Sequence, residues 1–266
     1  MPAQSFKKDI LNRLRNEELL RNDISLQEAF RIQDDSLKSL KQETAASSRV
    51  ERIEQVRFVA GLDVSYASLK HGEKGFACAL LWDLAEGAPK AKGLSTGPVR
   101  FPYKPSLLGF RECRLLAKAI KNLPRKPDVI MCDGHGCIHP KRFGEAVQLG
   151  MALNIPSMGV AKNPFIGYGR WETMKRTKGN AEPVWAKDPN EVSRESNELL
   201  GYSVSLNDAM KPVFVSAGFR LSLDLALALA LAAARDHRIP EPIYLADKLS
   251  RSMMKKEAQD DGSSPT

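Results

Sequence analysis

The middle of the chain alternates between apolar stretches and polar turns. In FVAGLDVSYA (58–67) apolar residues alternate with small or polar ones, and HGEKG separates this stretch from FACALLWD (76–83). The pattern is typical of two strands that are joined by a turn. Short continuous apolar runs predict three further strands, at 128–133, 156–162 and 211–218.

Segments with helical spacing lie between and after these strands. Apolar residues recur at the spacing of a helix face in LLGFRECRLLAKAIKNL (107–123) and KRFGEAVQLGMALN (141–154). Ser222 and Asp224 give a favourable start to a third, Ala/Leu-rich helix. A hairpin followed by strand–helix–strand units predicts an α/β fold in which helices flank a mixed sheet.

The two ends of the chain differ from this middle part. The N-terminal segment is polar and charged, and it has helical spacing at Ile10, Leu14 and Leu19–Leu20. The C-terminal sequence KKEAQDDGSSPT is too polar to build a core. We therefore expect a helical extension over 1–50 that packs late or loosely, one domain over 51–256, and a disordered tail over 257–266.

Two stretches inside the domain have no clear period. A connecting loop of more than about ten residues is expected after the strand at 76–83. Residues 163–210 combine Gly, Pro, Trp and charged residues with weak periodicity. This stretch is expected to be an insertion or a long loop.

Composition adds a charge argument. The 266 residues are 42% apolar and 27% charged, as in an ordinary soluble domain. The 40 basic residues exceed the 32 acidic ones, which gives a net charge of +8. This balance suits a polyanionic partner such as nucleic acid, although many proteins without such a partner share it.

The cellular compartment follows from what the chain contains. The four cysteines form no CxxC pair, which favours a reducing compartment. The longest apolar run, 221–234, is too short to span a bilayer and includes Asp224. Acidic residues in the N-terminal segment argue against a transit peptide. We expect a protein of the cytoplasm, the nucleus or both, with no membrane partner.

Three acidic residues occupy positions where apolar residues are expected. Asp63 lies in the middle of the first strand between the small residues Gly61 and Ser65, which leave room for a bound group. Asp133 ends a buried strand, and Glu112 falls on the apolar stripe of its helix. Each has an ordinary alternative explanation, as a helix cap or as a side chain that reaches solvent at the edge of the stripe.

Convergence of these acids would require a cation. Two carboxylates roughly 4–5 Å apart repel by about 3–4 kcal/mol at an effective dielectric constant of about 20. Clustered carboxylate oxygens select Mg²⁺ or Mn²⁺, which support phosphate hydrolysis. The residues therefore favour a metal-dependent phosphodiesterase that acts on nucleic acid.

A zinc site is the competing interpretation of CDGHGCIH (132–139). Its cysteines and histidines follow the pattern C-x2-H-x-C-x-H. This spacing is tighter than that of known zinc fingers, and Cys132 belongs to a predicted strand. Carboxylate ligation is therefore preferred.

The combined motifs resemble the endonuclease V family. The match extends over residues 58–250, and the pairing of PYxP…FRE with DGHGxxHP is specific to that family. The motifs are GLDVSY (61–66), PYKPSLLGFRE (102–112), DGHGCIHP (133–140), GVAK (159–162) and RIPEPIYLAD (238–247).

The resemblance implies a ribonuclease H-like fold and a strand-cutting activity. The family cuts inosine- or deoxyinosine-containing strands at the second phosphodiester on the 3′ side, leaving 3′-hydroxyl and 5′-phosphate ends. Its metal-binding acids correspond to Asp63, Glu112, Asp133 and Asp247, and its catalytic lysine corresponds to Lys162. Mg²⁺ is the expected cofactor, with Mn²⁺ as a substitute. The motifs are compatible with a mechanism that uses one ion and with one that uses two. A monomer acting on single- or double-stranded nucleic acid is expected.

The same resemblance implies a base-flipping loop. Tyr103 would fill the gap left by the flipped base, and Pro102 and Pro105 would stiffen its loop. Stacking of a base on an aromatic ring is worth roughly 1–3 kcal/mol, comparable to the cost of unstacking. The base pocket is expected around Gly134, Gly136 and His139. A surface tyrosine and a structural histidine are the ordinary alternatives.

The chain also departs from the family. Ser106 stands where the family commonly has glycine, and Lys104 adds a positive charge next to the tyrosine. The segment 163–200 is longer than the family core requires. Its residues Lys175, Arg176 and Lys178, near Tyr168, Trp171 and Trp185, would track a nucleic-acid backbone or belong to a solvated loop.

Two rival functions follow from these departures. One is another ribonuclease H-like nuclease, such as a junction resolvase or an exonuclease. The other is an inosine-binding protein whose catalysis has weakened, through the change at Ser106 for example.

Overall fold

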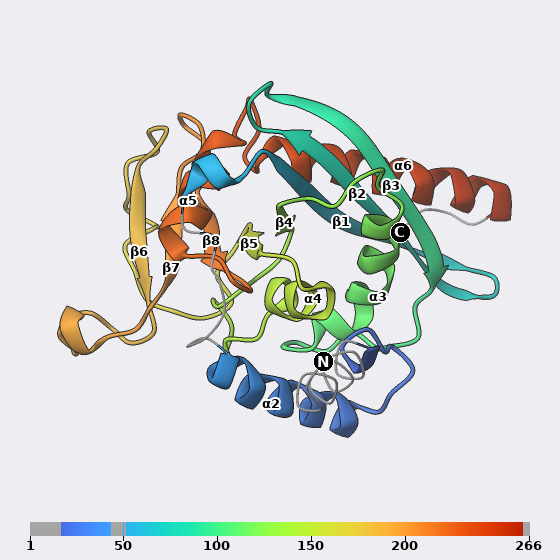
Figure 1. Ribbon diagram of the computed structural model, residues 1–266, viewed down its shortest axis with the longest axis horizontal. Coiled ribbons are helices and arrows are strands. Elements are labelled where there is room, and N and C mark those ends of the chain that lie inside the picture. Colours follow the sequence, from blue (N-terminus) through green and yellow to red (C-terminus); the bar gives the residue numbers. More distant parts are fainter. Residues whose placement is uncertain (1–16, 44–49, 51, 263–266) are drawn as a thin grey trace, which may run out of the picture.

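A single mixed β-sheet forms the middle layer of the protein (Figure 1). The computed structural model describes residues 17–43, 50 and 52–262. Within these residues eight strands pair in the order β3-β2-β1-β4-β5-β8-β7-β6. The strands are β1 (Phe58–Leu69), β2 (Gly72–Asp83), β3 (Ala88–Pro98), β4 (Val129–Cys132), β5 (Ser157–Ala161), β6 (Ala181–Trp185), β7 (Leu199–Val204) and β8 (Val213–Ala217).

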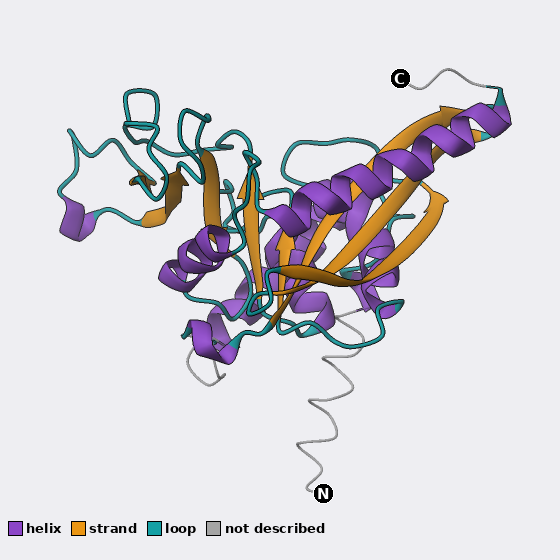
Figure 2. Ribbon diagram, turned by 90° about the horizontal axis from the view of Figure 1, so that it is seen from above, coloured by secondary structure: helices purple, strands orange, loops and turns teal. Residues whose placement is uncertain are grey.

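Helices cover both faces of this sheet (Figure 2). One face packs against α3 and α4, and the other face packs against α5 and α6. No helix in the described part of the chain is long and apolar enough to cross a bilayer. The helices are α2 (Leu26–Glu43), α3 (Leu108–Lys121), α4 (Glu145–Leu153), α5 (Leu223–Ala232) and α6 (Glu241–Asp261), with 3₁₀ turns η1 (Ile53–Gln55) and η2 (Arg194–Ser196).

The predicted α/β fold with helices on a mixed sheet is confirmed. β1 and β2 form the predicted antiparallel hairpin, and β4 lies parallel to both β1 and β5. The parallel pairs are the ones whose connections contain α3 and α4, as crossover geometry requires.

Two stretches expected to lack secondary structure contain strands. β3 replaces the loop expected after β2, and β6 and β7 form an antiparallel pair inside 163–210. β3 and β6 are the two edge strands of the sheet. Edge strands need less apolar sequence and tolerate proline. The polar sequence of β3 and Pro183 in β6 therefore gave no pattern that predicts a strand. The expectations of a loop and a long insertion were wrong for these strands.

The C-terminal helix extends further than expected. α6 remains helical through Asp261, and Gly262 ends it in a left-handed conformation. Ala258 is buried, and the Asp261 carboxylate accepts a hydrogen bond from the backbone of Lys70 at the β1–β2 turn. These contacts hold a segment whose composition predicts disorder, so that expectation was wrong for 257–261, and 263–266 lie outside the described residues.

The described part of the N-terminal segment contains α2, one face of which packs against the domain. Leu19, Ala29 and Ile32 share one core cluster with Phe110 and Phe143. The expectation that this segment packs loosely therefore does not hold for α2. Ile10 and Leu14, which contributed to the helical pattern, lie outside the described residues.

α6 fills the space beside the small residues of β1. A Cβ atom added at Gly61 would lie 2.2 Å from the Pro242 carbonyl carbon, and the Ser65 and Ser250 hydroxyls are 2.8 Å apart. The small side chains therefore allow a helix to approach the strand closely. The prediction that this space admits a bound group was wrong for Gly61 and Ser65.

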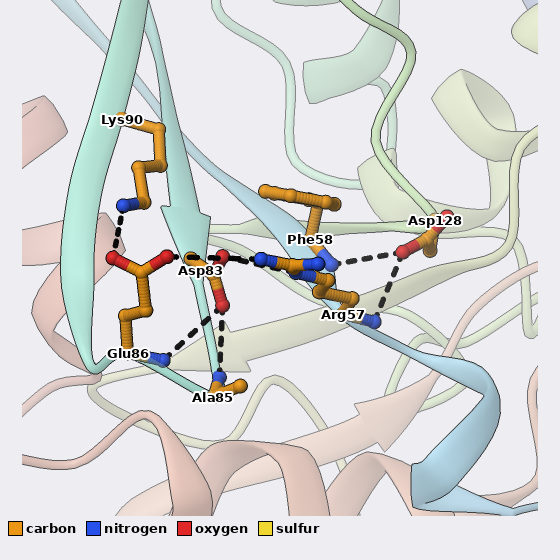
Figure 3. Close-up of polar contacts among 7 residues, drawn as sticks. All are labelled: Arg57, Phe58, Asp83, Ala85, Glu86, Lys90 and Asp128. Carbon is orange, nitrogen blue, oxygen red and sulfur yellow. Dashed lines mark hydrogen bonds and ion pairs between the residues drawn. The ribbon is translucent and has the colours of Figure 1, made fainter.

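A polar network fixes the beginning of β1 (Figure 3). The buried Asp83 carboxylate accepts hydrogen bonds from the Ala85 and Glu86 backbones, and the Arg57 guanidinium donates to it over 3.1 Å. Asp128 Oδ2 accepts the backbone N–H groups of Arg57 and Phe58. This network joins β1 to the residue before β4, so it sets the alignment of the strands that carry Asp63 and Asp133.

Candidate catalytic site

The strand pairing brings two of the predicted acids to the same end of two neighbouring central strands. Leu62 of β1 lies opposite Cys132 of β4, and the Asp133 N–H donates to the Leu62 carbonyl over 3.3 Å. Asp63 and Asp133 are each the next residue along their strands, so both lie at the carboxyl end of this parallel pair. Ligands of α/β proteins bind in this region of the sheet.

Helix α3 adds Glu112 to the same place. A cavity of about 60 Å³ is lined by the carboxylates of Asp63, Glu112 and Asp133, together with Glu145. The four side chains come from β1, α3, the end of β4 and the start of α4. The tertiary structure thus brings together acidic residues that are far apart along the chain.

Each predicted acid has a hydrogen-bonding partner from the protein. The Tyr66 hydroxyl donates to Glu112 Oε1 over 2.5 Å, and the Ser250 hydroxyl donates to Asp63 Oδ2. The pairs at Asp133 and Asp247 are ionic: Lys162 Nζ lies 2.6 Å from Asp133 Oδ2, and Arg251 Nε lies 2.7 Å from Asp247 Oδ1.

Burial and mutual repulsion favour the protonated acids. Burial raises the pKa of Asp63 to about 6, the Ser250 hydrogen bond opposes this shift, and the charges of Asp133 and Asp247 add to it. Burial raises the pKa of Glu112 to about 7, opposed by hydrogen bonds with Glu145 and Tyr66. Burial is the main cause of both pKa shifts, and the charges of the neighbouring carboxylates add to it. Asp247 is thus part of the same electrostatic cluster, although it does not line the cavity.

Glu145 is the member of this cluster that the sequence did not single out. It is 4% exposed, and its Oε1 atom has no hydrogen-bond partner. Burial raises the pKa of Glu145 well above its usual range, and the nearby charge of Glu112 adds to this shift. An acid in the first turn of a helix is common because it complements the helix dipole, so the sequence alone gave no reason to select it.

The donor types in this cluster suit a hard divalent cation. Carboxylate oxygens are the preferred ligands of Mg²⁺ and Mn²⁺, and the unpartnered Glu145 oxygen is an acceptor that lacks a donor. Among the described residues, no three acidic, histidine or cysteine side chains are arranged to hold one ion together. Asp63, Glu112 and Asp133 line the same cavity, so they would share a cation only after their side chains turn toward one another.

A larger pocket adjoins the acidic cavity. Its volume is about 350 Å³, and Asp133 and Glu145 line both spaces. Tyr103 is at its rim and is 70% exposed, so the ring extends into solvent. The pocket is also lined by Lys104, Pro105, Ser106, Gly134, His135, His139, Phe143, Lys162 and Phe165, among others.

His139 connects the two walls of this pocket. Its Nδ1 atom accepts N–H groups from Lys141 and Phe143, so Nε2 carries the proton and donates to the Ser106 carbonyl over 3.2 Å. Burial lowers the pKa of His139 to about 4, opposed by this hydrogen bond. A neutral ring therefore ties the Tyr103 loop to the loop that follows β4.

Two of the residues predicted for the loop and pocket do not line the pocket. Gly136 packs against β8, where an added Cβ atom would lie 2.1 Å from the Ala217 carbonyl oxygen. Pro102 is exposed and does not line the pocket. Gly134 does line it, and its missing side chain leaves space for Glu145 Oε2, which would be 2.7 Å from a Cβ atom.

Phe165 and His135 are pocket residues that the sequence did not indicate. The Phe165 ring centroid lies 5.8 Å from that of His135 and 5.5 Å from that of His139. His135 Nε2 bonds to the Asn163 carbonyl over 2.9 Å. Phe165 follows Lys162 in a loop without periodicity, so no sequence pattern distinguished it.

The basic residues of the long segment between β5 and β7 are exposed, whereas their aromatic neighbours differ from one another. Lys175, Arg176 and Lys178 all face solvent. Trp171 instead packs edge-on against Phe214 of β8 and lies, partly buried, against a core cluster. Trp171 is therefore not one of the aromatic residues that could line the predicted nucleic-acid track.

Comparisons with known proteins identify the family. The sequence model of the family described as Endonuclease V matches residues 38–248. The chain is 39% identical to the endonuclease V of Streptomyces avermitilis over 198 residues, which cover 74% of this chain and 81% of that relative. It is 33% identical to that of Dictyoglomus turgidum over 209 residues, 79% of this chain and 85% of the relative.

Solved structures give the same result. The crystal structure of the Streptomyces avermitilis protein matches with a TM-score of 0.74 and 33% identity, covering 88% of this chain and 95% of the other. A Ciona intestinalis endonuclease V, in complex with a 23mer DNA containing an inosine followed by a ribo-adenosine, matches with a TM-score of 0.72, 27% identity, and coverage of 88% and 100%. The predicted ribonuclease H-like fold is confirmed by these matches.

Proposed function

The chain belongs to the endonuclease V family of nucleases, and from this we propose that it is a divalent-metal-dependent endonuclease specific for inosine. It hydrolyses the second phosphodiester on the 3′ side of inosine in RNA or deoxyinosine in DNA. The products carry 3′-hydroxyl and 5′-phosphate ends. It acts as a monomer on single- or double-stranded nucleic acid.

The juxtaposition of an acidic cavity and a base-sized pocket supports this proposal most directly. Asp133 and Glu145 line both, so a base held in the pocket would place its neighbouring backbone close to the carboxylates. A pocket of about 350 Å³ is in the range used for small ligands. The related Ciona intestinalis protein was solved with inosine-containing DNA, which supports inosine as the base.

Different side chains bind the cation and contact the phosphate. Asp63, Glu112 and Asp133 would hold Mg²⁺ or Mn²⁺, with Asp247 contributing charge behind Asp63. When bound, the cation lowers the pKa of water and stabilises negative charge on the phosphate. Lys162 contacts the scissile phosphate, because its partly exposed ammonium lies at the border of the pocket and the cavity.

The exposed loop completes the substrate site. Tyr103 occupies the gap in the stack when the base turns into the pocket, and Pro105 limits the loop's motion. Gly134 and His139 belong to the pocket wall. Pro102 stiffens the loop from outside, and Gly136 acts by allowing the wall to approach β8.

The remaining expectations concern the setting of the enzyme. We place it in the cytoplasm, the nucleus or both, supported by four cysteines that are all free thiols. The catalytic unit covers 51–256, with the N-terminal segment as an extension that packs against it.

One experiment tests this function. Matched RNA and DNA oligonucleotides, each with a single inosine or with guanosine in its place, are incubated with the protein with and without Mg²⁺. We expect cleavage only of the inosine-containing strands and only with the cation, one phosphodiester beyond the nearest 3′ bond. Cleavage of both strands alike would indicate another ribonuclease H-like nuclease. Binding without cleavage would indicate an inosine-binding protein.

A further inference from the structure

Helix α2 contacts the base pocket from behind through Gln33. The Gln33 side chain is fully buried, and its amide nitrogen donates to the Ser106 carbonyl over 2.9 Å and to the Phe143 carbonyl over 3.4 Å. Ser106 belongs to the Tyr103 loop, and Phe143 belongs to the loop after β4. Both residues line the pocket, so one side chain joins its two walls.

The Ser106 backbone is in a conformation that needs support. Its φ angle is +73°, a region that favours glycine over residues with a Cβ atom. Its carbonyl oxygen accepts from both Gln33 Nε2 and His139 Nε2. A carbonyl oxygen has two lone pairs, so these two donors use its full capacity. The hydrogen bonds thus hold the residue that connects Tyr103 and Pro105 to α3.

A second contact of α2 acts on the opposite wall. Asp34 Oδ1 lies 2.5 Å from Lys141 Nζ, which also lies over the Phe30 ring. The Lys141 backbone in turn donates to His139 Nδ1. α2 therefore supplies one donor to the Ser106 carbonyl, Gln33. It also contacts the loop that carries the other donor, His139.

We propose that Gln33 is a positioning residue of the base pocket, which holds the Tyr103 loop at the pocket rim before the nucleic acid binds. It acts through the Ser106 carbonyl and touches neither the acidic cavity nor its side chains. Gln33 precedes the residues matched by the family model, so this role belongs to the N-terminal helix. The inference rests on the proposed function, since it assigns the pocket to a flipped base.

The test compares Gln33→Met with Gln27→Met. Methionine matches the length of glutamine but has no donor, and Gln27 is exposed on the same helix. Steady-state cleavage of an inosine-containing oligonucleotide with Mg²⁺ gives KM and kcat. We expect KM to rise roughly tenfold for Gln33→Met, the effect of losing the buried hydrogen bond to the Ser106 carbonyl, with kcat within about twofold of wild type. Gln27→Met should match wild type.

Hydrogen exchange on the free protein provides a readout that needs no substrate. In Gln33→Met, backbone exchange should quicken in residues 103–108 and stay unchanged in β1 and β4. If this variant does not fold, Gln33→Leu removes the same donor and is measured in the same way.

Three results would overturn the positioning role: an unchanged KM, a fall in kcat as large as the rise in KM, or faster exchange spread evenly over the chain. Failure of wild-type protein to cleave inosine-containing strands would instead overturn the proposed function, while the exchange data would still decide whether Gln33 holds the loop.

Discussion

The Lys162 ammonium lies 2.6 Å from Asp133 Oδ2, across the ends of two neighbouring parallel strands. The Asp133 side chain is mostly buried, whereas that of Lys162 is partly exposed toward the large pocket. One carboxylate of the acidic cavity is therefore neutralised by a cation from the protein. This pair marks the border between the region assigned to the base and the region assigned to hydrolysis.

Replacing Asp133 by asparagine should abolish cleavage. The change keeps the shape of the side chain but removes the charge that would hold a divalent cation beside Asp63. We expect a loss of roughly a thousandfold or more in single-turnover cleavage, with binding of inosine-containing strands still measurable by fluorescence anisotropy. Asp260→Asn, at an exposed position of α6, is the matched control. Substantial turnover by Asp133→Asn with Mg²⁺ would contradict the assignment.

Replacing Lys162 by methionine separates phosphate contact from cation binding. The substitution removes a positive charge that would compete with a cation for Asp133, so cation affinity should not weaken. Cleavage should slow by about 10²-fold because the scissile phosphate loses a charged contact. Single-turnover rates and calorimetric Mg²⁺ titration provide the two measurements. A weaker affinity for Mg²⁺ would show that Lys162 instead supports the cation site.

Tyr103→Ala should affect duplex substrates more than single strands. In a duplex the ring replaces stacking that the flipped base gives up, worth roughly 1–3 kcal/mol or about 5- to 150-fold. A single strand loses less stacking when its base turns out. Tyr103→Phe keeps the ring and should resemble wild type. Equal losses on both substrates, measured as kcat/KM, would remove the role of the ring in filling the stack.

A divalent cation should stabilise the folded protein. Burial raises the pKa of Asp63 to about 6 and that of Glu112 to about 7, so ionising them near neutral pH costs free energy that a bound cation offsets. Differential scanning fluorimetry should show Tm rising on the order of 5 °C in millimolar Mg²⁺ or Mn²⁺. Asp63→Asn should show a much smaller shift, and Asp260→Asn a full one. Identical shifts in all three proteins would place cation binding elsewhere.

The neutral His139 ring should make stability fall in mild acid. Its pKa is about 4 in the folded protein, against about 6.5 in the unfolded chain, so the unfolded chain binds the extra proton between these values. The stability that the neutral ring contributes is intact above about pH 6.5 and is lost as pH falls toward about 4. It amounts to about 2 kcal/mol between roughly pH 7.5 and pH 5.

Urea unfolding of wild type and His139→Asn checks this contribution. The asparagine oxygen can accept the same backbone N–H groups as Nδ1 but does not titrate. The free energy of unfolding of His139→Asn should therefore fall less between the two pH values, by about 2 kcal/mol. Parallel pH dependence in both proteins would show that the ring protonates without cost in the folded state.

Local sequence patterns predicted the elements whose burial is visible in their own residues. The hairpin of β1 and β2, the buried strands β4, β5 and β8, and the helices α3 and α4 all follow from apolar spacing. The edge strands β3 and β6 and the last turn of α6 did not, because contacts with distant residues compensate for their polar composition.

The same division holds for the candidate site. The sequence alone identified Asp63, Glu112 and Asp133, because an acid on a buried strand or an apolar stripe is out of place where it stands. It also identified Tyr103, since flanking prolines hold an aromatic residue in solvent. Glu145 and Gln33 have ordinary positions on their own helices, so the sequence gave no reason to select them.

Only the tertiary structure gave these two residues a role. Glu145 becomes unusual when α4 sets it against Glu112, and Gln33 when α2 sets it behind Ser106. A side chain's environment depends on every element packed around it, whereas a sequence pattern reports only the burial of the element to which the residue belongs. The chain itself therefore determined the family, the strands and the out-of-place acids, and the packing of helices far apart in sequence decided how those acids and the Tyr103 loop are held.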